Sequence, residues 1–385
     1  MRVYLDNNAT TMIDPIVLDE IKPFNEEKYG NPNSLHSFAS ETHIPLKTAM
    51  QKIYAGLHAH KDDSVVITSC ATESNNWVLK SIYFKYILTG QKNHIVISSV
   101  EHPSVMATAQ FLEKQGCRVT YLPVNNEGIV EASTLKDFLT PKTALVSIMW
   151  ANNETGAIFP IEEMAQMCKE KGVLFHTDAV QAVGKVKIDL QSTPIDYLTL
   201  SGHKFHAPKG VGALYMRRGK ELEPLLHGGS QMGGYRSGTL NVAGIVGLGR
   251  AMELAIDSMD YELEDMREYR DEFEDRLLEI PDTFVVTPRE KRTANTILIS
   301  FRGIEGESML WDLNRAGIGA STGSACASED LESNSVMDMI DVDEDLAHTA
   351  IRFSLSRFTT KEELDYTLEV VKKAVERLRT ISSSY

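Results

Sequence analysis

Seven short apolar runs between residues 60 and 220 constrain the fold of this chain more than any other feature of its sequence. The runs are rich in β-branched and aromatic residues, and helical patterns separate them. They do not alternate strictly with polar residues, which is typical of strands buried on both faces of a parallel sheet. The expected strands are 65–68, 95–98, 119–122, 144–149, 173–176, 197–200 and 212–216. We therefore predict an α/β fold built on a mostly parallel, seven-stranded sheet.

A smaller α+β unit is predicted after this region. The composition changes to a charged helical stretch over 261–280, which Pro281 ends. Beyond it, the patterns predict strands at 295–301 and 351–354, a helix at 308–316, and a last helix that starts at a capping box of Thr360 and Glu363. A chain of 385 residues is long for a single core. We expect a large domain of residues 15–255 and a small domain formed by 1–14 together with 256–385.

The composition limits the class of function. Hydrophobic residues make up 42% of the chain and charged residues 24%, as in a globular enzyme. No apolar run approaches the roughly 18 residues of a membrane-spanning helix, so no membrane partner is expected. The net charge of −15 repels phosphate backbones and argues against nucleic acid as a partner. The first residues contain no apolar signal core, and we expect a cytoplasmic location.

The four cysteines contain no CxxC pair, which argues against zinc and thioredoxin-type sites, and no metal site is expected on the chain alone. Cys117 and Cys168 are interpreted as buried core thiols. Cys326 differs because it lies among Gly, Ser and Ala and is followed by the acidic stretch 329–332. This context predicts an exposed and reactive thiol. Neighbouring acids raise a thiol pKa, so activation is expected only where Cys326 meets the active site.

Polar clusters follow five of the predicted strands. In a parallel sheet, ligands bind at the edge where the carboxyl ends of the strands meet. The clusters are 69–76, 101–102, 152–154, 178–181 and 201–204. Their common register predicts one binding site at this edge.

Two of these clusters carry groups that suit pyridoxal phosphate (PLP). Lys204 directly follows an apolar run and two small or polar residues, and such an amine can form a Schiff base with an aldehyde cofactor. Asp178 can pair with the protonated pyridine nitrogen, and Gln181 can hydrogen-bond the phenolic oxygen. The alternatives are a surface lysine and an aspartate that caps a helix.

A phosphate group is expected at the cluster 69–76, which follows a strand and opens a helix. Its small residues let backbone amides approach an anion, and the helix N-terminus attracts negative charge. Helix capping alone would also explain the pattern. Together with Ser201 and His203 this helix start predicts a phosphate cup.

Three further side chains are candidates for binding or catalysis. His102 at a strand end can stack on a planar cofactor and relay protons, although a structural histidine before Pro103 is the alternative. Asn153 can hydrogen-bond a cofactor oxygen or a substrate carboxylate, whereas its neighbours suggest only a turn. Arg352 can clamp a substrate carboxylate or form an ordinary ion pair.

With these residues in these positions, the chain resembles the cysteine desulfurases of the NifS/IscS type. These are fold-type I PLP enzymes in the class V aminotransferase group. The resemblance covers essentially the whole chain, and its details look most like NifS-type enzymes of ε-proteobacteria. The matching motifs are 4–11, 30–36, the phosphate loop 71–76, the ring-binding segment 178–181, the Schiff-base motif 201–204, the segment 231–239 and the catalytic loop 321–328.

The resemblance implies a role for each matching residue. Lys204 would hold PLP, Asp178 would pair with the ring nitrogen, and His102 would stack on the ring. The substrate carboxylate would be held by Asn153, Arg352 and Asn8. Cofactor binding would further involve Gln181, Ala71, Thr72, Ser201, Gly202 and His203, with Thr239 of the partner subunit. Cys326 would be the nucleophile.

The implied reaction converts L-cysteine to L-alanine and leaves a persulfide on Cys326. Lys204 or His102 would act as the base. A mobile loop would carry the sulfur to an iron–sulfur scaffold protein of the NifU/IscU type, with Cys326 as a transient iron–sulfur ligand. The enzyme would be a homodimer, because Thr239 would reach the neighbouring subunit's phosphate.

The chain departs from the family pattern at three places, and two alternative functions are considered. Cys70 replaces the usual Gly beside the phosphate loop, Met232-Gly233 replaces the usual Glu-Arg, and Asn33 stands where Ser is usual. A selenocysteine lyase would share the fold and Cys326. A non-catalytic PLP-binding docking scaffold is disfavoured because it needs neither Lys204 nor Cys326.

Overall fold

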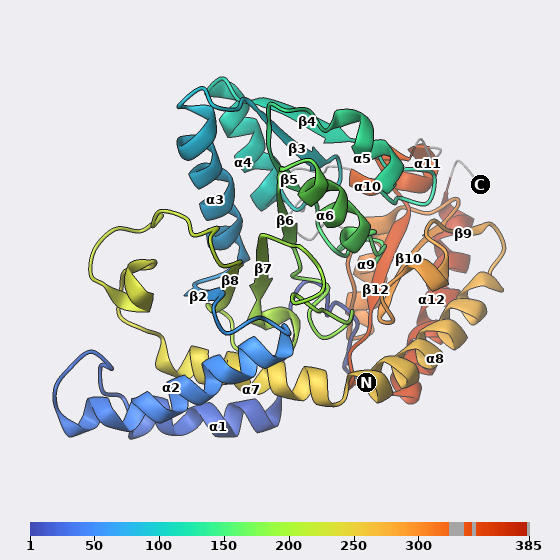
Figure 1. The fold of residues 1–385 in the computed structure, drawn as a ribbon. Coiled ribbons are helices and arrows are strands. Elements are labelled where there is room, and N and C mark those ends of the chain that lie inside the picture. Colours follow the sequence, from blue (N-terminus) through green and yellow to red (C-terminus); the bar gives the residue numbers. More distant parts are fainter. Residues whose placement is uncertain (323–334, 341–343, 383–385) are drawn as a thin grey trace.

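The structure is a computed structural model that describes residues 1–322, 335–340 and 344–382 (Figure 1). Its large sheet has the order β2-β8-β7-β6-β5-β3-β4. β8 runs opposite to the other six strands of this sheet. This confirms the prediction of a mostly parallel, seven-stranded sheet. The strands are β2 (Ser64–Thr68), β3 (His94–Ser98), β4 (Arg118–Leu122), β5 (Thr143–Ser147), β6 (Leu174–Asp178), β7 (Tyr197–Ser201) and β8 (Gly212–Met216).

Two strand ends differ by two residues from the sequence prediction, and the other boundaries of these seven strands agree within one residue. β5 ends at Ser147 rather than at residue 149, because the backbone N–H of Met149 donates to the Glu101 carboxyl at 2.8 Å instead of a neighbouring strand. β6 extends to Asp178, which places this side chain at the last position of a buried strand.

Successive residues of the large sheet pack into different hydrophobic clusters, as expected for a sheet covered on both faces. Val65 and Ile67 of β2 belong to one cluster, and Val66 belongs to the other. The first cluster contains residues of α1 (Pro15–Glu26), α2 (Ser37–Gly56), α5 (Ala132–Phe138), α6 (Ile161–Glu170) and α7 (Val242–Asp257). The second contains residues of α3 (Ala71–Ile82), its π-helical extension Tyr83–Ile87 and α4 (Pro103–Lys114).

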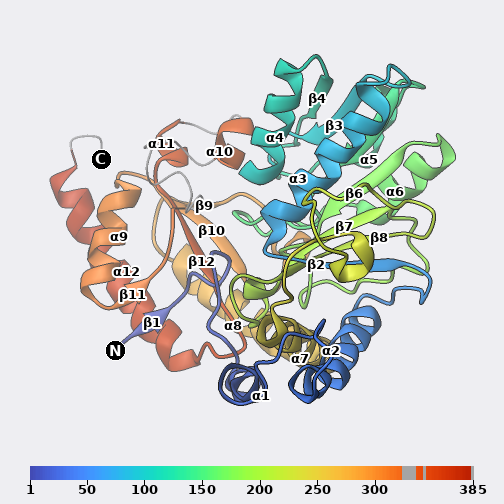
Figure 2. The same ribbon diagram turned by 90° about the vertical axis from the view of Figure 1, so that its left-hand side faces the viewer.

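A second, antiparallel sheet lies beside the large one (Figure 2). Its order is β12 (Ala350–Ser354), β10 (Thr296–Phe301), β9 (Thr283–Val285). The associated helices are α8 (Met259–Leu278), α9 (Gly306–Arg315), α10 (Ser335–Met339), α11 (Glu344–Ala347) and α12 (Lys361–Ile381). The predicted capping box of α12 is confirmed: the Glu363 amide donates to Thr360 Oγ1 at 3.3 Å, and the Thr360 amide donates to Glu363 Oε2 at 2.9 Å.

The division into two domains stays a prediction. It is supported by a separate hydrophobic cluster that contains Val3, Leu5 and residues of 273–378. Other residues of the C-terminal part, such as Leu298 and Val336, pack instead with the cluster of the large sheet. None of the helices in the described ranges is both long and apolar enough to cross a membrane.

The N-terminal segment connects the two sheets. β1 (Val3–Tyr4) pairs in parallel with β11 (Ile318–Gly319) on the side of the second sheet. The next residues bond to β12, where the Ser354 amide donates to the Leu5 carbonyl at 2.8 Å. The segment then reaches the large sheet, where the Thr11 amide donates to the carbonyl of His203 at 2.9 Å. Residues 8–11 are thereby placed against the end of β7.

A buried ion pair links α8 to the residues before β10. Arg292 Nη2 lies 2.5 Å from Glu274 Oε2, and the two side chains are only 1% and 4% exposed. The adjacent Asp275 is 64% exposed and pairs with Arg289 at 2.6 Å. Two consecutive carboxylates on one helix thus form ion pairs in opposite environments.

We predict that Glu274→Gln destabilises the protein by about 3 kcal/mol, because a buried guanidinium is left without its counter-charge. Asp275→Asn is the matched control and should cost about 1 kcal/mol or less, as for exposed pairs. Guanidinium denaturation of the three proteins measures both values. Equal losses in the two variants would contradict the assignment.

Candidate active site

Lys204 lies in a short 3₁₀ turn (Gly202–Lys204) directly after β7. Its Nζ donates to the carbonyl oxygens of Asn8 at 2.6 Å and Ala9 at 2.8 Å. The turn is closed by hydrogen bonds from the Phe205 and Ala207 amides to the Gly202 carbonyl. A Cβ on Gly202 would come within 2.9 Å of the Ala207 Cβ, so the turn has no room for a larger residue. Tight packing therefore fixes the amine at the carboxyl edge of the sheet.

Asp178 is held at the end of β6 and is 5% exposed. Asn75 on α3 donates through Nδ2 to Asp178 Oδ2 at 2.8 Å, and the Val180 amide donates to Oδ1 at 3.0 Å. The same Asn75 amide nitrogen donates to Ser104 Oγ at 2.9 Å. Ser104 in turn contacts His102 Nδ1 at 2.8 Å. A continuous chain of hydrogen bonds therefore joins the carboxylate to the imidazole.

His102 caps α4 through its ring. The Ser104 amide donates to His102 Nδ1 at 3.1 Å, so this nitrogen carries no proton. Burial lowers the pKa of His102; the nearby Asp178 opposes the shift and Lys204 adds to it. The imidazole is therefore neutral, with its proton on Nε2. The charges of Asp178 and Lys204 both act on His102, which is consistent with the three side chains sharing one site.

Glu101 directly precedes His102 in the chain and is 6% exposed. Its Oε1 accepts hydrogen bonds from Ser98 Oγ at 2.6 Å and from the Met149 amide at 2.8 Å. No hydrogen-bond partner for Oε2 exists among the described residues. Burial raises the pKa of Glu101 to about 8, and the charge of Asp178 adds to this effect. Glu101 is therefore a neutral acid at pH 7 that anchors the chain after β5.

The N-terminus of α3 provides a place for an anion. Its N-cap residue Cys70 makes no side-chain capping hydrogen bond. Gly212 of β8 pairs with both Thr68 and Ser201, and a Cβ there would approach the Cys70 backbone to 3.2 Å. This close approach brings the helix start, with Ala71 and Thr72, next to the buried Ser201. This arrangement is compatible with the predicted phosphate cup, which stays a prediction.

His203 completes this side of the site. Its Nδ1 lies 3.1 Å from Thr10 Oγ1. Burial lowers its pKa to about 4, and the charges of Lys204 and Lys209 contribute to the shift. A neutral His203 can donate one N–H to an anion.

Asn8 connects the N-terminal segment to the candidate substrate-binding residues. Its Nδ2 donates to the Asn153 carbonyl at 3.1 Å and to Thr296 Oγ1 at 2.9 Å. Its carbonyl accepts from Gln181 Nε2 at 2.9 Å as well as from Lys204. One asparagine thus contacts three of the predicted site residues.

Arg352 is 1% exposed on β12. Its Nη2 pairs with Asp6 Oδ1 at 2.8 Å, and its Nη1 donates to the Asn153 carbonyl at 2.8 Å. Asn152 Oδ1 accepts from the amides of Glu154 and Thr155, which fixes the turn that presents Asn153. The structure therefore places a guanidinium next to Asn153 and Asn8, as a clamp for a carboxylate requires.

Two predicted site residues are not joined to this group. Thr239 is exposed on a long segment, and no hydrogen bond or ion pair within the described residues links it to the start of α3. Three residues earlier, Arg236 pairs with Glu73 on α3 through two hydrogen bonds of 3.0 and 3.2 Å. Cys326 lies outside the described residues. The chain before it is fixed, because Ser321 forms two backbone hydrogen bonds with Arg352.

Four residues of the site were not predicted as functional from the sequence. Asn75, Ser104 and Glu101 hold Asp178, His102 and the turn after β5, and Asp6 holds Arg352. Asn75 and Ser104 had a weak signal, since each lies within one helical turn of a predicted site residue. Asp6 lies in the matching motif 4–11, but its pairing with Arg352 has no local signal, because the two residues are 346 apart in sequence.

The residues present fit PLP. A fixed amine, a buried carboxylate and a helix N-terminus without a side-chain cap lie at one sheet edge, and Gly212 lets the backbone at Cys70 pack closely against the sheet. An aldehyde, a pyridine nitrogen and a phosphate are the groups these three features bind.

Comparisons with known proteins agree with this chemistry. A family model described as aminotransferase class-V matches residues 3–367. A Dictyoglomus turgidum protein named cysteine desulfurase IscS is 48% identical over 99% of this chain and 96% of its own length. The Azotobacter vinelandii cysteine desulfurase NifS is 45% identical over 99% and 94%. A solved NifS-like protein superposes with a TM-score of 0.91 at 40% identity, over 99% of this chain and 100% of that one.

We predict that Glu101→Gln changes the pH dependence of stability. The pKa of Glu101 is about 8 in the folded protein against its usual 4.5, so the folded state binds more protons between these values. Stability contributed by this group is therefore lost as pH rises through that range. Glutamine mimics the protonated acid and lacks the loss. Denaturation midpoints at pH 5 and pH 8 should show the variant gaining on the parent as pH rises; parallel curves would show that Glu101 is ionised.

Proposed function

The chain belongs to the aminotransferase class-V family and is a cysteine desulfurase of the NifS/IscS type, and we propose that PLP held at Lys204 and Asp178 supports its removal of sulfur from L-cysteine. The observation that carries this proposal is the meeting of the Lys204 amine, the Asp178 carboxylate and the start of α3 at one sheet edge. Bound PLP would supply an electron sink for loss of the substrate's Cα proton.

The cofactor would be held by residues on three sides. Asp178, fixed by Asn75, would keep the ring nitrogen protonated. His102 would lie against the ring, and Gln181 would donate to the phenolic oxygen. The phosphate would be bound by the α3 amides at Ala71 and Thr72, by Ser201, Gly202 and His203, and by Thr239 of the partner subunit.

The substrate carboxylate would be bound by Arg352, with Asn153 and Asn8 beside it. Asp6 orients the guanidinium of Arg352 and offsets its positive charge before a substrate carboxylate binds. A solved relative described as SspA in complex with cysteine, 33% identical with a TM-score of 0.81 over 93% of this chain, supports an amino-acid substrate at this fold's site.

Lys204 is favoured over His102 as the base that takes the Cα proton. The ring nitrogen Nδ1 of His102 accepts from the Ser104 amide, and Nε2 carries the ring's proton. Neither nitrogen is therefore open to receive a proton. The Lys204 amine is freed when substrate takes its place and lies at the edge of the same site. His102 is left to stack and to donate through Nε2–H.

Cys326 would be the nucleophile of sulfur transfer. Its thiolate would attack the substrate sulfur, so that an S–S bond forms while the C–S bond breaks and its electron pair stays with the carbon framework, which leaves as alanine after protonation. The support is the sequence 321–328 and the fixed position of Ser321 beside Arg352. A homodimer, a cytoplasmic location, and transfer to a NifU/IscU-type scaffold complete the proposal.

We predict that Lys204→Ala abolishes the visible absorption band of the cofactor bound through this amine. The variant loses the amine proposed to bond the aldehyde covalently, and free PLP should be removable by gel filtration. Absorption spectra of the parent and the variant after PLP addition and desalting test this. A retained band of parental intensity would refute the assignment of Lys204.

We predict that Cys326→Ala keeps this band and reduces alanine formation from L-cysteine by at least about 100-fold, because the sulfur acceptor is missing. Peptide mass spectrometry after incubation with L-cysteine should find added sulfur on Cys326 in the parent. Alanine at the parental rate in the variant would remove Cys326 from the mechanism. Selenocysteine turnover that survives the substitution while cysteine turnover does not would favour the lyase alternative.

A further inference from the structure

Lys185 carries a partly buried amine beside Gln181. It follows Gln181 by four residues, and its Nζ donates to Gln181 Oε1 at 2.7 Å. Burial lowers its pKa to about 7, and the charges of Lys204 and Arg352 add to the shift. Lys185 therefore lies within electrostatic reach of both the cofactor lysine and the carboxylate clamp.

The two contacts of the Gln181 amide determine its orientation. Gln181 is 4% exposed, and its Nε2 donates to the Asn8 carbonyl at 2.9 Å. A carbonyl oxygen only accepts, so the NH₂ group must face Asn8 and Oε1 must face Lys185. The reversed amide would place Oε1 against the Asn8 carbonyl and leave Lys185 facing N–H groups.

This orientation leaves one hydrogen of Nε2 for the cofactor. An amide nitrogen carries two hydrogens, and the Asn8 carbonyl accepts one of them. Lys204 donates to the same carbonyl at 2.6 Å, so the Gln181 amide nitrogen and the cofactor amine lie next to one another. The second hydrogen of Nε2 could therefore be donated to the phenolic oxygen of a cofactor bound at Lys204.

The backbone between Asp178 and Lys185 supports this arrangement. The amides of Ala182 and Val183 donate to the Ala179 carbonyl at 2.9 and 3.0 Å, and the Lys185 amide donates to the Ala182 carbonyl at 2.9 Å. Gly184 has φ +74°, and a Cβ there would lie 3.1 Å from the Ala255 Cβ. A glycine is required at this point, and it turns the chain so that Lys185 reaches back to Gln181.

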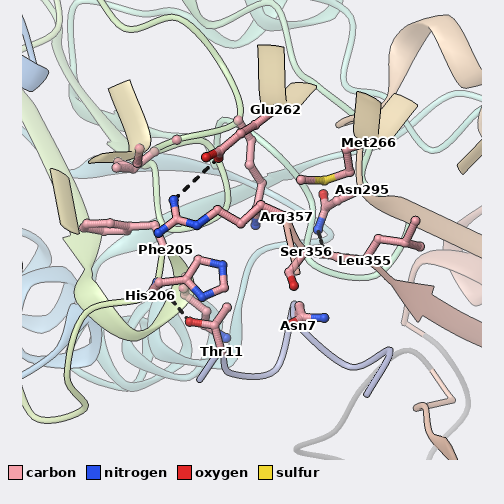
Figure 3. A pocket seen from close by; sticks show the side chains of 15 residues that line it. Asn7, Thr11, Phe205, His206, Glu262, Met266, Asn295, Leu355, Ser356 and Arg357 are labelled. Carbon is pink, nitrogen blue, oxygen red and sulfur yellow. Dashed lines mark hydrogen bonds and ion pairs between the residues drawn. The ribbon is translucent and has the colours of Figure 1, made fainter. Parts of the chain in front are cut away.

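The other charged groups around Lys185 already have partners. Lys185 and Lys204 line a cavity. His206, Glu262 and Arg357 line the same cavity (Figure 3). Arg357 pairs with Asp14 and with Glu262, the latter at 3.5 Å. His206 Nδ1 contacts the Met12 carbonyl at 3.0 Å, and burial lowers its pKa to about 4. The hydrogen bond to Gln181 therefore orients the Lys185 side chain.

We propose that Lys185 is a positioning residue that fixes the amide of Gln181 with its NH₂ group toward the phenolic oxygen of the bound cofactor. This inference rests on the proposed PLP site. Either protonation state of the Lys185 amine can donate to Oε1. A donor at the phenolic oxygen stabilises its anionic form, and so it lowers the affinity of the cofactor for the proton shared with the nitrogen linked to Lys204.

The test is a pH titration of the visible absorption band of the holoenzyme. In Lys185→Met the amide loses its fixed partner, and the midpoint should move upward by about 0.7 pH unit, the equivalent of one hydrogen bond. Lys187→Met is the matched control, since Lys187 is exposed on the same segment and should titrate like the parent. Gln181→Glu keeps Lys185 paired but cannot donate, so it should also move the midpoint upward.

A double variant separates positioning from a direct effect of the Lys185 charge. In a Gln181→Ala background, Lys185→Met should cause no further shift, because no amide remains to be oriented. The same upward shift in that background, or an unchanged midpoint in Lys185→Met while Gln181→Glu shifts, would overturn the proposal. A parent protein that shows no PLP band at all would instead refute the proposed function.

Discussion

The hydrogen bonds from Lys204 Nζ to the carbonyls of Asn8 and Ala9 are the contacts on which the rest of the site depends. These carbonyls belong to a segment whose preceding residues are bonded to the second sheet and whose following residues are bonded to the end of β7. The same segment carries Asp6, which orients Arg352. A movement of the second sheet relative to the large one would therefore change the surroundings of the amine and the clamp together.

Burial sets the charge state of the groups around this segment. It keeps His102 and His203 neutral and favours the protonated form of Glu101. These groups contribute hydrogen bonds without adding charge. Beside these groups, the site has the carboxylates of Asp178 and Asp6 and the cations Lys204 and Arg352. The last two match the two anionic groups expected at the site, a phosphorylated cofactor and a substrate carboxylate, while Asp178 faces a cationic ring nitrogen.

Features set by local sequence could be predicted, whereas features set by packing between distant segments could not. The strands, the order of the polar clusters and the capping box of α12 follow from periodicity and neighbouring residues, and the structure bears them out. The end of β5 was wrong by two residues because Glu101, some fifty residues earlier, takes the Met149 amide. The pairing of Asn75 with Asp178 depends on how α3 lies on the sheet, which no local pattern encodes. The role of Cys326 stays a prediction, since it lies outside the described residues.

The chain on both sides of 323–334 is anchored near Arg352 and Asn153, the residues proposed to bind the substrate carboxylate. Before it, Ser321 exchanges two backbone hydrogen bonds with Arg352. After it, the Val336 amide lies 3.4 Å from Glu154 Oε2, next to Asn153 in the chain. If Cys326 is the nucleophile, as proposed, these anchors would tether it to the groups that would hold the substrate, and tethering raises an effective concentration. Because Arg352 bonds Asp6 as well, the tether, the clamp and the segment holding Lys204 form one connected unit. The proposed site therefore depends on both ends of the chain, through the segment that follows β1 and through β12.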